Sequence, residues 1–122
     1  MDTSEKKKVD IHERAFEFGV RILTFCKFLD EQPGVNWALS KQLFRSGTSI
    51  GANIEEAQAG QSTADFINKM NIALKEARET FYWLRLTDAA KLVDGKRISD
   101  LKRESEEIMK IIGAIIVSTK KK

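Results

Sequence analysis

Apolar residues recur in alternating steps of three and four along four successive stretches, and this spacing constrains the fold more than any other feature. Residues spaced in this way lie on one face of an α-helix. We therefore expect four amphipathic helices, at about residues 11–31, 37–58, 63–92 and 96–119. The expected core-facing seams are Ile11, Ala15, Phe18, Ile22, Phe25 and Leu29; Leu39, Leu43, Gly47, Ile50, Ile54 and Ala57; Ile67, Met70, Leu74, Ala77, Phe81 and Leu84; and Ile98, Leu101, Ser105, Ile108, Ile112, Ile115 and Thr119.

Capping and breaking residues separate these segments. Asp10, Asn36 and Ser62 are suited to cap the first three helices, because their side-chain oxygens can accept a bond from a free backbone N–H. Asp65, three residues after Ser62, completes a variant of the capping box. The expected stop signals are Gln32-Pro33-Gly34, Gly60 and Asp94-Gly95.

The second segment contains an unusual run of small residues between Arg45 and Ala57. Gly47 and Gly51 each cost about 1 kcal/mol of helix propensity relative to alanine. One interpretation breaks the helix and makes residues 45–49 a loop. We favour a continuous helix, because the apolar periodicity passes through both glycines in register. Such a thin helix lets a neighbouring backbone come close.

Four helices with short connections predict an all-α fold, an antiparallel up-down-up-down four-helix bundle. The length of 122 residues suits one domain spanning residues 1–122. Domains of this size bury a modest core and often gain stability from association.

The composition of the chain bears on disulfide formation and on cellular location. Cys26 is the only cysteine, so no intramolecular disulfide can form, and its apolar neighbours favour a place in the core. A charged N-terminus without a following apolar run argues against a signal peptide. No stretch reaches the roughly 18 apolar residues of a membrane span. We expect a cytoplasmic protein with no membrane contact. Its net charge of +3 arises within residues 94–122, which end in Lys120-Lys121-Lys122.

Catalytic and metal-binding patterns are absent from the sequence. His12 is the only histidine, and the Glu-x-x-His pairs of di-iron bundles are missing. The small-residue run lacks the Gly-Lys-Ser/Thr ending of a phosphate-binding loop. A carboxylate site at Glu56, Glu76 and Glu79 is an alternative, but ion pairing of these glutamates with Lys75, Arg78 or Arg45 is the more common arrangement. We expect no enzyme activity, no cofactor and no metal.

Four residues of the third segment form a basic stripe with one aromatic ring: Lys75, Arg78, Tyr82 and Arg85. Such a stripe can contact phosphates and stack a base. The alternative, favoured for a monomer, is an ordinary charged flank balanced by nearby acidic residues, namely Glu76, Glu79 and Asp88. An oligomer can change this balance by aligning several stripes around one axis.

The chain has more large apolar residues than four core seams need. Such an excess favours contact with another subunit, and a wide internal core is the alternative. The residues outside the tightest seams are Phe16, Trp37, Phe44, Phe66, Trp83, Ile111 and Ile116.

Three segments together resemble a known bacterial family: residues 49–56 (SIGANIEE), Asp65-Phe66, and residues 74–84 (LKEARETFYWL). The chain is similar to the four helix bundle proteins, also called 23S rRNA intervening-sequence proteins, from about residue 11 to 118. Gly51 stands where many members have proline. The resemblance implies a left-handed antiparallel bundle with no established catalytic residues.

The same resemblance implies possible partners. Related proteins are accessory factors of diversity-generating retroelements and look like homopentamers whose basic surfaces contact nucleic acid and a reverse transcriptase. The family-motif positions matched here are Asn53, Glu56, Glu76 and Tyr82, for which a purely structural polar role is the alternative.

Three functional hypotheses follow. The first is a non-enzymatic, homo-oligomeric helical-bundle adaptor, with the pentamer as family precedent, that binds structured RNA or DNA through Lys75, Arg78, Tyr82 and Arg85. The second is a protein–protein scaffold without nucleic-acid binding. The third is a carboxylate metal site at Glu56 and Glu76.

Overall fold

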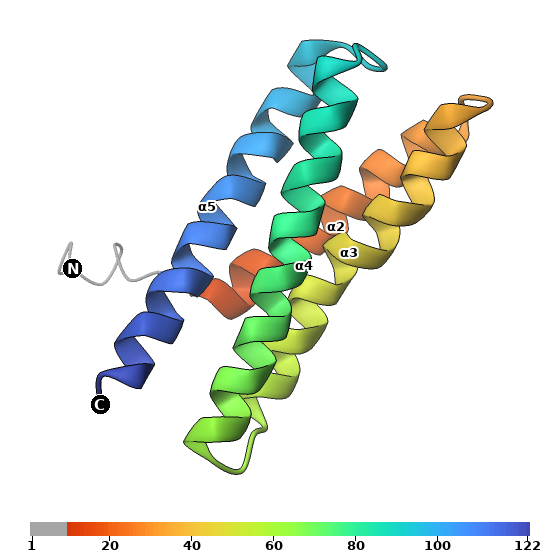
Figure 1. Cartoon of the computed structure of the whole chain (residues 1–122). Helices are drawn as coiled ribbons and strands as arrows, with labels where there is room; N and C mark the ends of the chain where they lie inside the picture. Colours follow the sequence, from red (N-terminus) through yellow and green to blue (C-terminus); the bar gives the residue numbers. More distant parts are fainter. Residues whose placement is uncertain (1–9) are drawn as a thin grey trace, which may run out of the picture.

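The computed structural model describes residues 10–122, and this part of the chain forms four α-helices and no strand. The helices are α2 (Ile11–Asp30), α3 (Val35–Gln58), α4 (Thr63–Ala89) and α5 (Gly95–Lys120). Residues 1–9 lie outside the described part. Figure 1 shows that the connections alternate between the two ends of the molecule, so successive helices run in opposite directions. The predicted all-α four-helix bundle is confirmed, and its left-handed twist stays a prediction.

Side-chain caps begin three of the helices. Asp10 accepts a hydrogen bond from the N–H of Glu13 at 3.1 Å, and Ser62 accepts one from the N–H of Asp65 at 3.1 Å. Asp94 caps α5 by accepting from the N–H of Lys96 at 3.0 Å. Each cap satisfies one backbone donor that has no partner within its helix. The caps predicted at Asp10 and Ser62 are therefore confirmed.

The cap predicted for the second helix is wrong. The helix starts at Val35, and its cap is Gly34, which makes no side-chain hydrogen bond. Gly34 has φ of 76°, a conformation open to glycine, and this lets the chain reverse sharply after Pro33. Asn36 therefore lies inside the first turn and is 8% exposed. The backbone freedom of glycine sets this boundary two residues earlier than side-chain capping alone predicts.

The end of α4 also differs from the expectation. The helix stops at Ala89, three residues before the predicted end, because Lys91 adopts a left-handed conformation with φ of 56°. The N–H of Leu92 bonds the carbonyl of Thr87 at 3.2 Å, and the N–H of Lys91 bonds that of Asp88 at 3.0 Å. These two bonds form a Schellman motif. Its left-handed position usually holds glycine, so a lysine there gives no signal in the sequence.

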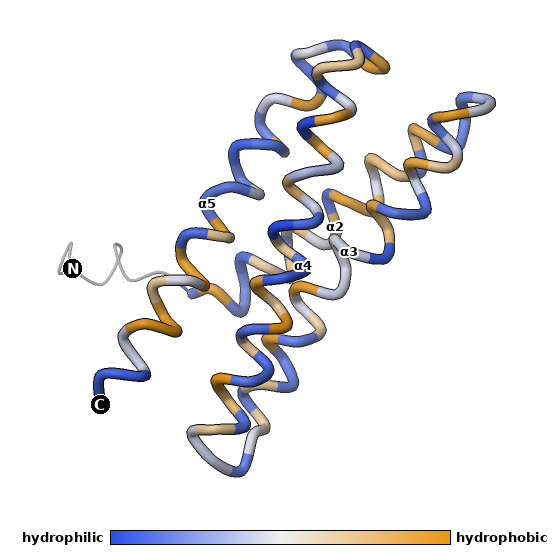
Figure 2. Tube along the Cα trace, viewed as in Figure 1, coloured by the Kyte–Doolittle hydropathy of each residue, from blue (hydrophilic) through white to orange (hydrophobic). Residues whose placement is uncertain are grey.

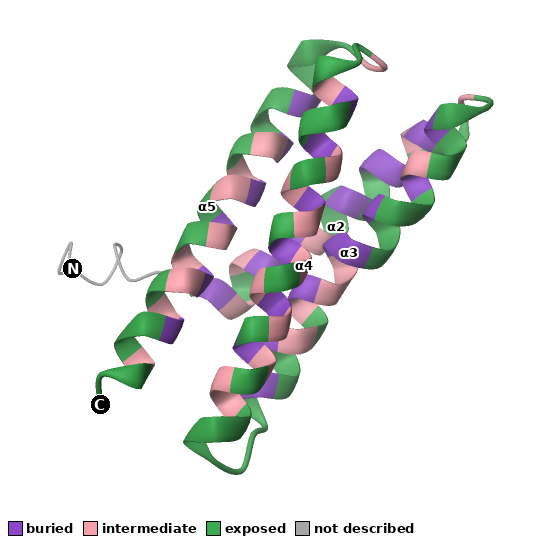
Figure 3. Ribbon diagram, viewed as in Figure 1, coloured by how far each residue is buried: buried purple, intermediate pink, exposed green. Residues whose placement is uncertain are grey.

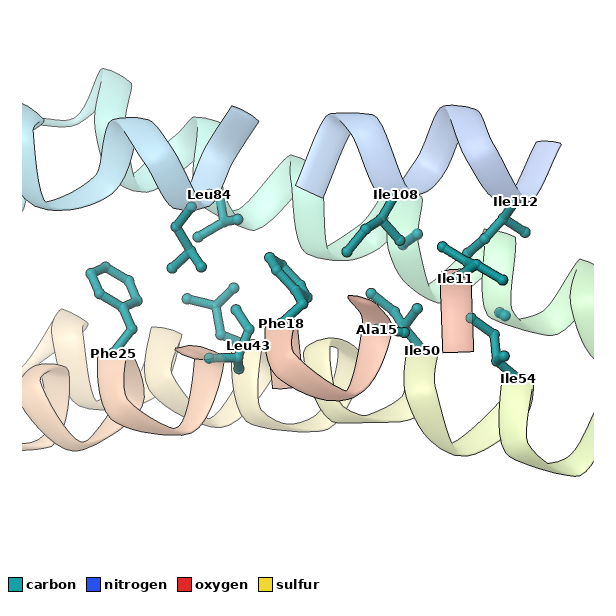
Figure 4. Close-up of a cluster of buried hydrophobic side chains, with 14 of the residues drawn as sticks. Ile11, Ala15, Phe18, Phe25, Leu43, Ile50, Ile54, Leu84, Ile108 and Ile112 are labelled. Carbon is teal, nitrogen blue, oxygen red and sulfur yellow. The ribbon is translucent and has the colours of Figure 1, made fainter. Parts of the chain in front are cut away.

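The helices pack in a cycle, in which each contacts the next along the chain and α2 closes the ring weakly against α5. The α2–α3 and α4–α5 hairpins diverge toward their tips in Figure 1. Polar and apolar residues alternate along every helix (Figure 2), and the buried residues recur at helical intervals (Figure 3). The largest fully buried apolar side chains are Phe18, Ile22, Leu29, Leu43, Ile50, Ile54, Met70, Leu84, Ile98, Ile108 and Ile112. Figure 4 shows side chains from all four helices meeting in this core.

Two seams are shifted from their predicted positions. The core residues of α4 are Met70, Ala73, Ala77, Thr80, Leu84 and Thr87, whereas the predicted Ile67, Leu74 and Phe81 are only partly buried. The two threonines can be buried because Thr80 donates to the carbonyl of Glu76 at 2.8 Å and Thr87 to that of Trp83 at 2.7 Å. In α5, Ile116 is buried at 5% exposure in place of Ile115.

The small-residue run is part of one continuous helix, as predicted. A Cβ atom on Gly47 would lie 2.8 Å from Cγ2 and 2.9 Å from Cγ1 of Ile22. Real side chains do not approach so closely, so glycine is what allows α2 to pack here. Farther along the same pair of helices, the Cys26 thiol donates to the carbonyl of Ser40 at 3.4 Å, and the Ser40 hydroxyl donates to that of Cys26 at 3.2 Å. Cys26 is a core residue, and burial raises the pKa of its thiol.

The surplus apolar residues divide into three groups. Phe16, Trp37 and Phe44 are more than half exposed. Phe66, Trp83 and Ile111 are partly buried and pack against the core. Ile116 belongs to the core itself, so its assignment to the surplus is wrong. Ile115 and Ile116 are adjacent in the sequence, and the apolar spacing alone does not decide which of the two faces the core.

Candidate functional site

The basic stripe lies on the outer surface of α4. Lys75, Arg78, Tyr82 and Arg85 are all exposed, and Tyr82 is 52% accessible. They occupy nearly three turns of the helix, in steps of three, four and three. The structure thus places all four predicted residues together on one solvent-facing row.

The acidic residues beside this row point toward neighbouring helices. Arg45 of α3 donates to the two carboxylate oxygens of Glu76 at 3.3 and 3.4 Å and also pairs with Glu79. Glu79 accepts a further bond from the Trp83 indole N–H at 3.0 Å. On the other side, Lys102 of α5 donates to Asp88 at 2.7 Å. The three carboxylates beside the stripe are therefore bonded to two cations of α3 and α5 and not to the stripe itself.

The cations of the stripe are not ion-paired in the described part of the chain. Within residues 10–122, no carboxylate lies within ion-pairing distance of Lys75, Arg78 or Arg85. The Arg85 guanidinium lies 5.9 Å from the centre of the Phe81 ring, where a cation–π contact is weak. Tyr82 meets the Trp83 ring edge-on, with centroids 5.4 Å apart. A row of unpaired cations around an exposed aromatic ring suits contacts with phosphates and a base.

The lysine tail is a second group of exposed cations. Lys120, Lys121 and Lys122 are exposed at the C-terminus of α5. Figure 1 shows this terminus at the end of the bundle where α4 begins. The tail and the stripe thus belong to two helices that contact each other, α5 and α4.

The family-motif residues occupy separate places. Asn53 is partly buried, and its side chain donates to the carbonyl of Ser49 within α3 at 2.9 Å. Glu56 is exposed, while the Glu76 side chain is 15% exposed and held by Arg45. Within residues 10–122, no three side chains of His, Cys, Asp or Glu are grouped as metal ligands. Glu76 and Glu79 form the ion pairs with Arg45 that the sequence analysis favoured.

Sequence reasoning placed Ser105 in the core but missed two other buried polar residues, Ser46 and Thr80. Ser46, Thr80 and Ser105 are fully buried on α3, α4 and α5. The hydroxyls of Ser46 and Thr80 share a hydrogen bond of 2.9 Å, while the Ser105 hydroxyl makes no hydrogen bond within residues 10–122. The burial of Ser105 was predictable because it falls at the helical spacing of the apolar residues Leu101 and Ile108. The hydrogen bond between Ser46 and Thr80 depends on packing that the sequence alone does not give.

Ion pairs also join α2 to its two neighbours, α5 and α3. The Arg14 guanidinium donates to both carboxylate oxygens of Glu104 on α5, at 2.9 and 2.7 Å, and lies 3.5 Å from Glu107. These bonds raise the pKa of Arg14 above its usual range. His12 of α2 pairs with Glu55 of α3, and the hydrogen bond that its imidazole donates to that carboxylate raises the pKa of His12.

Two apolar grooves lie on the α3 side of the molecule. The larger, about 420 Å³, lies between the start of α3 and the end of α4 and is lined by Val35, Leu39, Trp83, Leu86 and Leu92 among others. The second, about 300 Å³, lies between α2 and α3 beside Phe16, Val20 and Leu23. Among the described residues, no helix is long and apolar enough to cross a lipid bilayer.

Four helices joined by short loops around one apolar core make this chain an all-α four-helix bundle. It belongs to the 23S rRNA-intervening sequence protein family, whose model matches residues 7–114. It is 47% identical to a protein of unknown function from the S23 ribosomal protein family of Bacteroides thetaiotaomicron VPI-5482, solved at 1.70 Å. The match covers 88% of this chain and 98% of that chain, with a TM-score of 0.81. No curated protein matches the chain, and neither matching name includes a catalytic activity.

Proposed function

We propose that this protein is a non-enzymatic, homo-oligomeric adaptor of the cytoplasm that binds structured RNA or DNA through the basic stripe of α4. The observation that carries the proposal is the pairing of Glu76 and Glu79 with Arg45, together with that of Asp88 with Lys102. Because those carboxylates bond cations of neighbouring helices, Lys75, Arg78 and Arg85 stay free of ion pairs within residues 10–122 and are available to an anionic ligand.

The roles within the site follow from residue chemistry. The two guanidinium groups suit bidentate contacts with phosphate oxygens, and Lys75 provides a point charge. Tyr82 offers an exposed ring on which an unpaired base can stack. The stripe is short, so one copy contacts few phosphates, and self-association multiplies the surface by presenting several stripes to one nucleic acid.

A fluorescence-anisotropy titration against structured fragments of 23S rRNA, at two salt concentrations, tests this function. We expect micromolar binding that weakens at the higher salt concentration, because released counterions drive the association. The double variant Arg78→Ala/Arg85→Ala should bind less tightly. The matched control is Lys27→Ala/Lys96→Ala, which removes two exposed cations that also lack a carboxylate partner within residues 10–122. Absence of salt-dependent binding by the wild type would reject the proposal.

A second candidate function is that of a protein–protein scaffold without nucleic-acid binding. The exposed Phe16, Trp37 and Phe44, together with the apolar grooves on both sides of α3, favour it. It predicts a stable oligomer whose mass does not change when nucleic acid is added. Size-exclusion chromatography with light scattering, with and without RNA, separates the two candidates.

A further inference from the structure

A pocket of about 240 Å³ opens between α2 and α5, the two neighbouring helices with the weakest contact in the bundle. The hairpins that contain these helices diverge toward their tips (Figure 1), and the pocket lies on the tip side of the Arg14–Glu104 ion pair. We call it the α2–α5 pocket. Its lining consists of Val20, Arg21, Thr24 and Phe25 of α2 and Arg97 and Leu101 of α5.

The two arginines of the α2–α5 pocket occupy positions that repeat the Arg14–Glu104 pair. Arg14 of α2 donates to both carboxylate oxygens of Glu104 of α5, at 2.9 and 2.7 Å. Arg21 follows Arg14 by seven residues, and Arg97 precedes Glu104 by seven. Because α2 and α5 are antiparallel, both steps run about two helical turns in the same direction, toward the tips. The seam therefore joins a cation to a carboxylate at one level and places two cations at the next level.

No carboxylate in residues 10–122 pairs with either arginine of the pocket. Acidic residues near the start of α5 have other partners, since Asp94 caps the helix and Asp100 pairs with Arg103. Glu17, one turn before Arg21, does not line the pocket. Two like charges at one pocket repel each other, so an anion placed between them is attracted by both.

The Arg97 side chain is held across the seam by an aromatic ring. Its Cζ lies 3.8 Å from the centre of the Phe28 ring of α2. A cation–π contact uses no hydrogen-bond acceptor, so the five N–H donors of this guanidinium stay available. The arginines that do donate side-chain hydrogen bonds in the described part of the chain are Arg14, Arg45 and Arg103. Arg97 is therefore positioned at the pocket with its hydrogen-bonding capacity unused.

The base of the α2–α5 pocket is apolar. Phe25 and Leu101 are 5% and 4% exposed, and Val20 on the wall is 50% exposed. The Thr24 hydroxyl donates to the Val20 carbonyl at 3.2 Å, so its proton is already used within α2. The volume is below the roughly 300–1,000 Å³ of pockets that hold drug-sized ligands. The pocket thus suits a small molecule that carries both an anionic group and an apolar group.

We propose that the α2–α5 pocket binds a small organic oxyanion, a carboxylate or phosphate attached to an apolar group. The oxyanion accepts hydrogen bonds from Arg21 of α2 and Arg97 of α5, because guanidinium groups match the geometry of these anions. The apolar group covers the base of the pocket. The bound anion takes the place that the Glu104 carboxylate holds two turns away, and so joins the two helices whose contact is weakest. The site shares no residue with the α4 stripe and goes beyond the proposed function.

Isothermal titration calorimetry of the full-length protein tests the ligand class with four probes: phenyl phosphate, benzoate, inorganic phosphate and benzyl alcohol. We expect at least one of the two aromatic anions to bind with a dissociation constant of about 1 mM or lower. It should bind about tenfold more tightly than inorganic phosphate, because the ring covers the apolar base, and more tightly than neutral benzyl alcohol. The tighter of the two aromatic anions shows whether the site prefers phosphate or carboxylate.

Glutamine variants test the two arginines. Arg21→Gln/Arg97→Gln should weaken binding of the aromatic anion about tenfold or more, since it removes both guanidinium groups. The matched control Lys27→Gln/Lys96→Gln removes two exposed cations that do not line the pocket. At physiological ionic strength the control should keep the affinity within about twofold, because salt screens charges outside the pocket. Absence of binding by both aromatic anions would overturn the inference. Equal affinities of the arginine variant and the control would also overturn it, as would equal affinities for the anions and benzyl alcohol.

A charge reversal tests the register without a ligand. Arg21→Glu places a carboxylate opposite Arg97 and keeps the Arg97–Phe28 contact, so it recreates the arrangement of Arg14 and Glu104. Its melting temperature should exceed that of Arg21→Gln by about 1–4 °C, while its affinity for the aromatic anion should fall about tenfold or more. A melting temperature equal to or below that of Arg21→Gln would overturn the opposition of the two arginines on which the site rests. RNA binding through α4 is measured separately, so either result leaves the proposed function intact.

Discussion

The contact between Gly47 and Ile22 gives a sharp prediction about stability. Gly47→Ala adds a Cβ at 2.8 Å from Cγ2, 2.9 Å from Cγ1 and 3.3 Å from Cβ of Ile22. Ile22 is fully buried and β-branched, so its χ1 angle cannot change cheaply. Overpacking of a core costs about 1–3 kcal/mol, and three close contacts favour the upper half of that range. The gain in helix propensity offsets about 1 kcal/mol.

We expect Gly47→Ala to lower the free energy of unfolding by about 1–2 kcal/mol, measured by urea denaturation at one protein concentration. Gly113→Ala is the matched control, because a Cβ there meets nothing within 4 Å in another mid-helix position. It should raise the stability by up to about 1 kcal/mol. If Gly47→Ala stabilises the protein as much as Gly113→Ala does, the close approach of α2 to α3 described here is wrong.

Three further outcomes follow from the site and the core. Ser105→Ala should leave the free energy of unfolding unchanged or raise it by about 1 kcal/mol, because it removes a buried hydroxyl without a partner. Ser46→Ala should lower the free energy of unfolding by a similar amount, because it removes the hydrogen-bond partner of Thr80. The pKa of His12 is raised in the folded state, so its contribution to stability is present below about pH 6.5 and is lost as the pH rises through the folded-state value. An NMR titration of this single histidine measures the shift, and Glu55→Gln should reduce it. Arg45→Ala should weaken RNA binding in the anisotropy assay by leaving two carboxylates unpaired beside the stripe, and an unchanged affinity would show that those ion pairs do not matter.

Helix positions were predictable because the apolar period is strong and runs through each segment without interruption. The continuous helix through Gly47 was found in this way, and the family resemblance pointed to the same fold. The helix boundaries were harder to predict. The boundaries at Gly34 and Lys91 depend on backbone conformations with positive φ. A glycine in the sequence indicates such a conformation, whereas a lysine does not. The α4 seam was misplaced because Thr80 and Thr87 look polar, yet each satisfies its hydroxyl within the helix.

The residues of the basic stripe were predicted from spacing, but their electrostatics were not. In the sequence, Glu76, Glu79 and Asp88 lie as close to the stripe as its own cations do. Only tertiary packing reveals that Arg45 and Lys102, from other helices, hold these carboxylates. The same limit applies to the exposure of Phe16 and Phe44, which depends on which side of each helix meets the core.

The salt dependence of nucleic-acid binding tests the central claim most directly. The measurement is the slope of log Kobs against log salt concentration, for wild type and for Lys75→Ala/Arg78→Ala/Arg85→Ala, with one structured 23S rRNA fragment. Each lost phosphate contact reduces the slope by about 0.7–0.9, so we predict a slope shallower by about 2 for one engaged stripe and by more if several copies bind. An identical slope and affinity for both proteins would contradict the assignment of the α4 stripe as the nucleic-acid surface.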